Sequence, residues 1–435
     1  MPPWEIWVSE SQERMMFTVD PKNVEKVLSI CKEWDVEAVT IGEVISEKNN
    51  IVHYNGTEIL NLDLDFTTGG PVYKRPFNLP EYETDKRKLQ PTYPNNFNEI
   101  INDLIGKPEI ASKDWVIRQY DHEVRGKTVL KPIQGPVGKD VHGDSSVLKP
   151  VDDSWKGLAL TSDVNPYLME ANPYHGTMSA VEEVCRNLAS VGARIDSLAD
   201  CLCFGNPRKP DIMGQFKASC EALKDAAIAV DVPYVSGNVS LYNETAEGAI
   251  PPTPVLMGIG LVKDIRKCTS SDMKKEGSIW IIGETKEEMG ASLYYRHLNL
   301  ESGNVPTTNF EEFMPRMEQL IQAIENEEVV ACHDISTGGL AISIIEMCMS
   351  GVGASIELTT DLRADIELFS ESNGRWVVQV ANGCEEKFAN RFDYAKQIGN
   401  VNNDIIFTKE GEIISKLGIE ESRKNWTNPL WNRLA

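Results

Sequence analysis

The sequence has no apolar run that could cross a membrane. A spanning helix needs about 18 or more consecutive apolar residues, and no stretch of this chain comes near that length. The chain also lacks the basic-then-apolar order of a signal peptide, since Met1 is followed by Pro-Pro-Trp-Glu. We therefore expect a cytoplasmic protein with no membrane partner.

Motifs of several large enzyme classes are also missing. The nine cysteines include no CxxC pair and no histidine spacing typical of a zinc site, so we expect reduced cysteines that mostly fill cores. No Walker loop, dinucleotide-binding glycine fingerprint or Ser/His/Asp triad stands out. Any nucleotide chemistry must therefore use another kind of site.

Positive charge is scarce. The chain has 43 Lys and Arg against 66 Asp and Glu, for a formal net charge of −23. Such a balance repels a phosphate backbone, so we expect no nucleic-acid partner. A bound nucleotide would have to be held by backbone N–H groups, a few local cations and bridging Mg²⁺.

The length and composition that are present indicate a multidomain globular chain. At 435 residues it exceeds the usual domain size of roughly 100 to 200 residues, which predicts two or three domains. Its hydrophobic content of 41% and charged content of 25% are typical of a folded protein with more than one core.

An internal repeat links the two ends of the chain. Ser9–Arg14 reads Ser-Glu-Ser-Gln-Glu-Arg before an apolar stretch, and Ser370–Arg375 reads Ser-Glu-Ser-Asn-Gly-Arg before another. Ile41–Val44 and Ile398–Val401 then match, as do the segments around Gly56 and Gly411. Three collinear matches indicate two copies of one unit.

Both copies have the same expected elements. We expect a strand after each Ser-Glu-Ser, at 15–19 and 376–380, a helix at 22–34 and 385–397, and a hairpin around each glycine. The second copy ends a domain that we place at residues 266–435. Residues 1–75 then represent only the last third of such a domain and cannot bury a full core alone. We expect another polypeptide, or sequence upstream of this chain, to complete it.

Between the copies lie a linker and an alternating domain. Residues 76–96 carry four prolines among charged and aromatic residues, which predicts an extended linker. Residues 97–265 alternate strands and helices, with helices expected from Pro173 to Ser190 and over 210–229. The fold class we expect is therefore mixed α/β and α+β.

Two polar strings follow expected strands. Asp200 opens the string Asp200–Pro207, where its carboxylate could face a pocket or simply cap a turn. In Gly237–Glu244, Gly237 would let the backbone approach a phosphate, while Asn238 and Ser240 offer an amide oxygen and a hydroxyl. The second string favours a binding site over a plain loop.

Three other polar segments could serve either the fold or a functional site. His333–Gly339 precedes an apolar helix, so Asp334 or Ser336 is expected as its N-cap, and an anion site at the paired glycines is the alternative. His175 at a helix start could transfer protons but is more often structural there. Ser9–Arg14 is rich in short polar groups that suit hydrogen bonding to a substrate, or would serve as a bare turn.

These strings together resemble one enzyme family over nearly the whole chain. Ser9–Arg14, Gly237–Glu244 and His333–Ser336 are similar to motifs of the PurL type of phosphoribosylformylglycinamidine synthase, and the last also occurs across the wider aminoimidazole-ribonucleotide-synthetase-like superfamily. The resemblance extends to Tyr120–Val124 and Pro251–Pro254.

The resemblance implies a PurM/PurL-like carboxy-terminal half. On this basis, residues 97–265 are an N-type domain that forms part of a central β-barrel, 266–435 are a C-type α+β domain, and 1–75 are the tail of a preceding C-type domain. The family's catalytic histidine would lie in the missing half, so no catalytic residue is expected in this chain.

The resemblance also implies a reaction and residue roles. The family uses ATP, Mg²⁺ and glutamine-derived ammonia to convert formylglycinamide ribonucleotide to its amidine in purine biosynthesis. By motif position, Asp200 and Gly237 would contact ATP and Asn238 would bind Mg²⁺. The residues that would contact substrate are Ser240, Glu10, Ser11 and Gln12. Expected partners are the amino-terminal half, a glutaminase and a small bridging subunit, and the chain alone should be inactive.

Two other functions remain as alternatives at this point. The chain could be a non-catalytic scaffold half that holds a structural nucleotide, or a sister ATP-dependent synthetase of the same superfamily. Retention of Asn238 and Ser240 argues against the scaffold. The Ser9–Arg14 string, together with the lack of a reactive cysteine loop at the start, argues against the sister enzymes.

Overall fold

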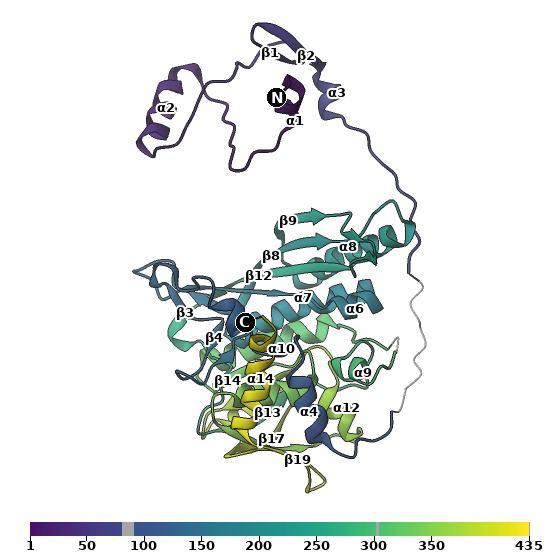
Figure 1. Cartoon of the computed structure of the whole chain (residues 1–435). Coiled ribbons are helices and arrows are strands. Elements are labelled where there is room, and N and C mark those ends of the chain that lie inside the picture. Colours follow the sequence, from purple (N-terminus) through teal and green to yellow (C-terminus); the bar gives the residue numbers. More distant parts are fainter. Residues whose placement is uncertain (81–90, 302–303, 435) are drawn as a thin grey trace. The chain divides into compact units, whose positions relative to one another are not determined.

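The computed structural model describes residues 1–80, 91–301 and 304–434. The chain divides into two compact units, Met1–Lys74 and Arg75–Ala435 (Figure 1). Each unit is described by itself below.

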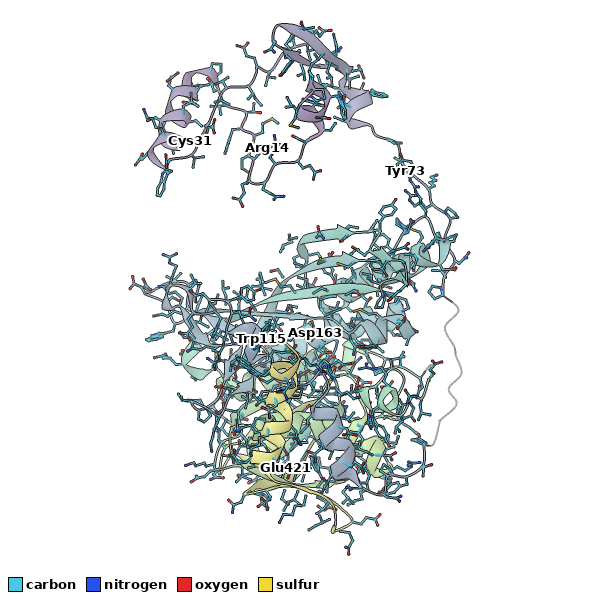
Figure 2. The ribbon with its side chains drawn as sticks, in the orientation of Figure 1. Arg14, Cys31, Tyr73, Trp115, Asp163 and Glu421 are labelled. Atoms are coloured by element: carbon cyan, nitrogen blue, oxygen red, sulfur yellow. The ribbon has the colours of Figure 1, made fainter. Side chains whose placement is uncertain are left out.

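The first unit consists of short elements joined by extended chain (Figures 1 and 2). Its elements are α1 (Pro3–Val8), a 3₁₀ turn η1 (Pro21–Asn23), α2 (Val24–Glu33), β1 (Asn49–Tyr54), β2 (Thr57–Asp63) and α3 (Leu64–Thr68). Among residues 1–74, all of which the structure describes, none is buried. This unit therefore has no core of its own.

Two of the expected elements of the first copy are present and one is absent. The expected helix at 22–34 is α2, and the hairpin around Gly56 is β1–β2, where Asn55 and Gly56 take φ of 50° and 80°. The strand expected at 15–19 is wrong, because that segment has no regular structure. A strand needs neighbours to hydrogen-bond with, and this unit supplies none beyond the hairpin.

A six-stranded sheet forms the first layer of the second unit. Its order is β3-β6-β7-β12-β8-β9, and its pairs are antiparallel except β8 with β9. The strands are β3 (Thr128–Leu130), β6 (Ser146–Leu148), β7 (Gly157–Asp163), β8 (Ala193–Cys203), β9 (Tyr234–Ser240) and β12 (Thr253–Val262). The helices expected from Pro173 to Ser190 and over 210–229 are confirmed as α7 (Pro173–Ser190) and α8 (Pro210–Val230), and α6 (Pro166–Ala171) precedes them.

Helix α7 covers only one face of this sheet. A Cβ at Gly258 of β12 would lie 2.3 Å from Val184 Cγ1 of α7, so glycine allows the close approach of helix and strand. On the opposite face, Met257 and Leu261 are 36% and 50% exposed. The sheet therefore has one packed face and one open face (Figure 1).

A seven-stranded sheet forms the second layer, in the order β14-β16-β13-β17-β15-β18-β19. Its strands are β13 (Ser278–Ile282), β14 (Val329–Asp334), β15 (Gly353–Leu358), β16 (Trp376–Val380), β17 (Ala395–Asn402), β18 (Ile405–Lys409) and β19 (Glu412–Leu417). The strand expected at 376–380 and the hairpin around Gly411 are confirmed as β16 and β18–β19. The helix expected at 385–397 is partly wrong, because it ends at Ala389 and β17 begins at Ala395 to pair with β13 and β15.

The remaining helices and short elements complete the unit. They are α4 (Phe97–Ile105), α5 (Asp114–Ile117), η2 (Val124–Gly126), β4 (Ile133–Gln134), β5 (Val141–His142), β10 (Glu244–Thr245), β11 (Gly248–Ala249), η3 (Ile265–Lys267), α9 (Leu293–His297), α10 (Phe310–Glu325), α11 (Gly339–Cys348), α12 (Ala364–Phe369), α13 (Glu385–Ala389) and α14 (Ile419–Leu434).

Two hydrophobic cores stabilise this unit, and one of them joins the two sheets. Val184 and Leu188 of α7 share a cluster with Phe313 of α10 and Trp376 of β16. Helix α4 belongs to the other cluster, with α11 and the β15–β18 side of the second sheet. The predicted boundary at 265/266 remains a prediction, since the two sheets pack as one body.

Part of the predicted linker is attached to α8. Residues 81–90 of the expected linker lie outside the described residues. Ahead of them, the Asn78 backbone N–H donates to Pro210 O at 3.0 Å, and its side chain donates to Asp211 Oδ1 at 2.8 Å. A Cβ at Gly214 would lie 1.7 Å from Asn78 O. We call residues 77–79 the strap.

Two expectations drawn from absent motifs can be compared with the structure. In the described part of the chain, no helix is both long and apolar enough to span a membrane. All nine cysteines are free thiols.

Candidate functional site

The fold brings four of the predicted site residues together on two neighbouring strands. In the parallel register of β8 and β9, Asp200 lies opposite Gly237, and Cys201 lies opposite Asn238. Ser240 ends β9, opposite Cys203. Successive register pairs alternate between the two faces of the sheet, so Asp200 lies on the face packed by α7, next to buried Leu256 of β12, and Asn238 and Ser240 lie on the open face.

Gly237 leaves room for the Asp200 carboxylate. A Cβ at position 237 would lie 3.0 Å from both Asp200 Oδ atoms, so a side chain there would displace the carboxylate. Burial raises the pKa of Asp200 above its ordinary value. No hydrogen bond or ion pair to another described residue engages this carboxylate, which leaves it available to a ligand.

The turn after β9 is held by its own hydrogen bonds. Asn243 Nδ2 donates to Ser240 O at 2.9 Å and to Phe204 O at 3.1 Å. Glu244 accepts from the Asn206 N–H at 2.9 Å and pairs with Lys209 at 3.0 Å. The two polar strings identified in the sequence thus stabilise each other's loops.

Asn238 and Ser240 lie on β9 just before this loop, and both carry a side-chain oxygen. Asn238 uses its amide N–H to contact Cys201 Sγ at 3.5 Å, so its carbonyl oxygen has no partner within the described chain. Ser240 Oγ lies 3.2 Å from Asn243 Nδ2. The amide oxygen of Asn238 is a hard donor of the kind Mg²⁺ prefers, while the Asp200 carboxylate lies on the other face of the sheet.

The other three predicted residues, Glu10, Ser11 and Gln12, belong to the first unit. Their loop is organised by Arg14, whose Nη2 donates to Ser9 O at 2.7 Å and whose Nε donates to Ser11 O at 3.4 Å. Their relation to Asp200 and its neighbours rests on the sequence alone.

The second copy of this loop has the same internal bonds. Arg375 Nη2 donates to Ser370 O at 2.6 Å, and its Nε donates to Ser372 O at 2.8 Å. Each Arg thus donates hydrogen bonds to the backbone carbonyls of the two serines in its own loop. The exposed loop Ser9–Arg14 therefore has the same internal hydrogen bonds as the largely buried loop Ser370–Arg375.

In the second copy, however, the polar groups serve the fold. Glu371 Oε1 accepts the N–H groups of Leu293 and Gly338 at 2.8 Å each, at the starts of α9 and α11. Burial raises the pKa of Glu371 to about 7. The predicted N-cap role of Asp334 or Ser336 is wrong, because Gly338 is the N-cap residue of α11 and the Glu371 carboxylate binds its N–H group. The anion considered for the paired glycines is thus supplied by the chain itself.

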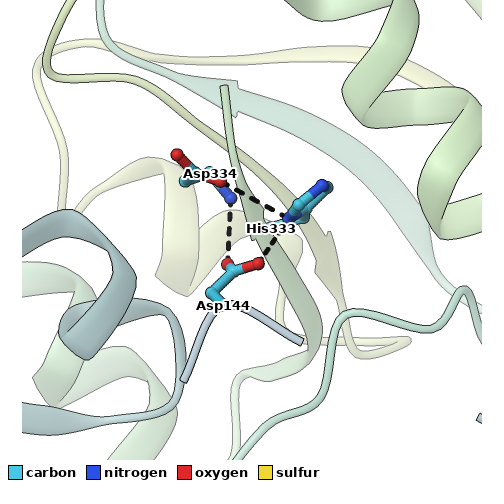
Figure 3. A group of neighbouring side chains, drawn as sticks. All are labelled: Asp144, His333 and Asp334. Carbon is cyan, nitrogen blue, oxygen red and sulfur yellow. Dashed lines mark hydrogen bonds and ion pairs between the residues drawn. The ribbon is translucent and has the colours of Figure 1, made fainter. Parts of the chain in front are cut away.

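Asp334 instead belongs to a cluster that sequence reasoning missed. Asp144, His333 and Asp334 each offer one potential metal-ligand atom, and these atoms lie within 4.8 Å of one another (Figure 3). His333 comes from β14 and Asp144 from the turn between β5 and β6. Separation by 189 residues hides this contact from the sequence.

The cluster is an ion-pair network rather than an open set of ligands. His333 Nδ1 lies 2.6 Å from Asp144 Oδ1, and Nε2 lies 3.3 Å from Glu346 Oε2. Asp334 Oδ2 accepts from Arg186 Nε at 3.1 Å. Burial disfavours the charge, but Asp144 and Glu346 raise the pKa of His333 well above its usual value. Each ring nitrogen of His333 therefore already faces one carboxylate.

More acidic groups surround Arg186 of α7. Glu182 and Glu183, one turn earlier on the helix, both pair with it, and Arg186 also faces Asp334. Burial raises the pKa of Glu182 to about 7, although Arg186 opposes the shift. His175, also on α7, has its backbone N–H bound to Asn172 Oδ1 at 2.9 Å. That bond caps the start of α7, and the backbone of His175 is its donor.

Two models of known domain families match this chain. The model for the AIR synthase related protein, N-terminal domain, matches residues 142–262. The model for the C-terminal domain of the same family matches residues 1–55 and 274–408, so one domain model covers both copies of the repeat. The chain belongs to the AIR synthase related protein family. The expected mixed α/β class with N-type and C-type domains is confirmed.

Curated relatives of this AIR synthase related chain are named "Phosphoribosylformylglycinamidine synthase subunit PurL". The Thermococcus sibiricus subunit is 39% identical over 423 residues, covering 94% of this chain and 56% of the relative. The Thermoplasma acidophilum subunit is 34% identical over 434 residues, covering 98% and 57%. The expected resemblance to PurL is thus confirmed, and the chain spans little more than half the length of these relatives.

Solved structures agree with the fold. The structure described as T. maritima PurL complexed with ATP has a TM-score of 0.61 and 22% identity, and the match covers 92% of this chain and 57% of that one. The structure of PurLQS from Thermotoga maritima has a TM-score of 0.63 and the same identity. At this identity the likeness supports the AIR synthase related fold.

Proposed function

We propose that this chain is the carboxy-terminal part of a phosphoribosylformylglycinamidine synthase. In that role it would help convert formylglycinamide ribonucleotide, ATP and glutamine-derived ammonia to the amidine, ADP and phosphate, in the cytoplasm. The observation that carries the proposal is the grouping of Asp200, Gly237, Asn238 and Ser240 on β8 and β9. Similarity to PurL subunits over 94% to 98% of the chain supports it.

Each of these residues has a chemical task in the proposal. Asp200 contacts the ATP, and Gly237 holds the nucleotide site open by leaving the Asp200 carboxylate in place. Asn238 holds Mg²⁺ through its unpaired amide oxygen, and Ser240 contacts the ribonucleotide substrate. When bound, Mg²⁺ neutralises charge on the phosphates during phosphoryl transfer.

The net charge explains why a metal is needed. A chain with a formal charge of −23 repels a nucleotide triphosphate unless cations offset it. Lys209, in the loop after β8, is already paired with Glu244. Asn238 supplies an oxygen ligand instead, which suits a site that recruits Mg²⁺ together with the phosphates.

The first unit supports the proposal that another polypeptide completes the enzyme. Met15, Met16 and Phe17 are 83%, 85% and 71% exposed. Their counterparts in the repeat, Trp376, Val377 and Val378, are fully buried, because β16 lies between β13 and β14. Two partner strands would bury the first-unit residues in the same way. We propose that the amino-terminal half supplies those strands, while Glu10, Ser11 and Gln12 contact substrate.

The remaining partners follow from the need for ammonia. A glutaminase subunit would supply it, and a small bridging subunit would hold the two together. One related structure carries the name PurLQS from Thermotoga maritima. The chain alone is expected to be inactive, since the proposed catalytic histidine belongs to the other half.

The proposal is tested by variants in a reconstituted complex with an amino-terminal half. Asn238→Ala and Ser240→Ala should each lower turnover by roughly a hundredfold, since each removes a group that positions reactants. Asn403→Ala, in the exposed β17–β18 turn, is the matched control. A scaffold half that contributes no reacting group would keep full turnover in both variants while the complex still assembles, and that result would refute the proposal.

A further inference from the structure

Two cysteines lie side by side on β8 within the described chain. Cys201 and Cys203 are two residues apart, and alternate residues of a strand point to the same face. Their Sγ atoms are 3.7 Å apart. Both side chains are partly buried, whereas Cys185, Cys332 and Cys348 are fully buried.

The pair lies on the open face of the six-stranded sheet. Cys201 is opposite Val255 of β12, which alternates with the residues that pack against α7. On the other side, Asn238 lies opposite Cys201 and Ser240 lies opposite Cys203. The two thiols thus form a row with an amide and a hydroxyl beside them.

The contacts of the pair show that the thiols are accessible to each other and to a ligand. Among the described residues, the polar contacts of these thiols are the hydrogen bond between the two sulfurs and the contact of the Asn238 amide N–H with Cys201 Sγ at 3.5 Å. Within the described residues, no ion pair involves either sulfur, and both side chains keep part of their surface exposed. Two thiolates at this spacing can bind one soft ion without a change in the strand.

We propose that Cys201 and Cys203 form a two-thiolate site for a thiophilic cation such as Cd²⁺ or Zn²⁺. On binding, each thiol loses a proton and its sulfur forms one bond to the metal, so two protons are released for each ion. This site does not depend on the proposed function of the chain.

Cadmium titration of the whole chain, in a thiol-free reductant, tests the site. The expected result is one tight ion per chain, seen as a near-ultraviolet thiolate-to-cadmium absorption band. Cys201→Ser and Cys203→Ser should each weaken binding by on the order of a hundredfold, because the second thiolate binds as an intramolecular ligand. Cys220→Ser, which removes a partly buried single thiol on α8, is the matched control.

Cys201→Ser and Cys203→Ser also show whether the proposal is wrong. An absorption band that persists unchanged in both serine variants, or no band in the parent chain, would show that the two thiols merely pack against each other. Circular dichroism of each variant checks that the fold is retained. Phenylarsine oxide gives a second readout, because one arsenic atom bridges two thiols and releases water. The bridged adduct should form in the control and in neither serine variant.

Discussion

At the residue scale, the position of the Asp200 carboxylate depends on the missing side chain of Gly237. A Cβ there would lie 3.0 Å from both Asp200 carboxylate oxygens. The glycine is needed here for space, since its φ is not in the left-handed region. Its contribution is to leave room for the unpaired Asp200 carboxylate on β8.

Gly237→Ala therefore tests the role of Asp200 without removing the acid. We expect the KM for ATP in the reconstituted complex to rise roughly tenfold, a change of about 1.4 kcal/mol, as the carboxylate is displaced. Gly418→Ala is the control, because no atom lies within 4 Å of a Cβ built there. An unchanged KM in the Gly237 variant would contradict the placement of Asp200 in the nucleotide site.

Glu371 makes a prediction about pH. Burial raises its pKa from 4.5 to about 7, so the folded state binds a proton more tightly than the unfolded state. Its stabilising contribution is complete below about pH 4.5 and is lost as the pH rises towards about 7. The loss is about 3 kcal/mol for a shift of this size.

Urea denaturation at several pH values measures this effect. Glu371→Gln should flatten the decline in unfolding free energy between about pH 4.5 and about pH 7, because glutamine does not titrate. Glutamine can still accept the N–H groups of Leu293 and Gly338. A variant with the same pH dependence as the parent would show that Glu371 is ionised without penalty.

At the element scale, single side chains join elements that are far apart in sequence. The Asp144–His333 contact ties the turn before β6 to β14, and both side chains are at least nine-tenths buried. Removing one partner of a buried ion pair leaves the other charge uncompensated.

Asp144→Asn should thus lower the unfolding free energy by about 3 kcal/mol at neutral pH. The control is Asp153→Asn, at an exposed position in the loop before β7. Because the pKa of His333 is raised, the stabilisation by its ion pairs is complete below about pH 6.5 and is lost as pH rises through the raised value. A parent-like melting temperature for Asp144→Asn would argue against the ion pair.

The strap depends on Gly214, near the start of α8. A Cβ at Gly214 would lie 1.7 Å from Asn78 O, so the strap cannot stay on α8 when residue 214 has a side chain. Gly214→Ala should release residues 77–79 and speed chymotrypsin cleavage after Phe77 by roughly tenfold or more. Gly418→Ala should be cleaved like the parent. Equal cleavage of all three chains would mean that the strap is not held at Gly214.

At the scale of the whole molecule, the sequence predicts where helices and strands form better than it predicts which elements pack beside them. Helix α7 was predicted with its observed ends because Pro173 starts it and apolar residues recur along it. The strand expected at 15–19 failed, since an apolar run becomes a strand only beside other strands. The same holds for β17, which forms in place of the end of an expected helix because β13 and β15 flank it.

The site follows the same pattern. Asp200 and Asn238 could be found from their strings, since a strand was expected just before each string, although both residues lie within β8 and β9. Asp144, Glu346 and Glu371 could not, because their roles arise from contacts with residues 13 to 190 positions away. Cys201 and Cys203 were visible in the sequence, but only the strand places their sulfurs on one face.

The central claim is that this chain provides part of a synthase site that another polypeptide completes. The most direct measurement mixes the chain with the amino-terminal half of a PurL-type protein and follows ADP release with formylglycinamide ribonucleotide, ATP and ammonia. We predict no turnover from either part alone and clear turnover from the mixture. Turnover by this chain alone, or none from a mixture that has assembled, would contradict the claim.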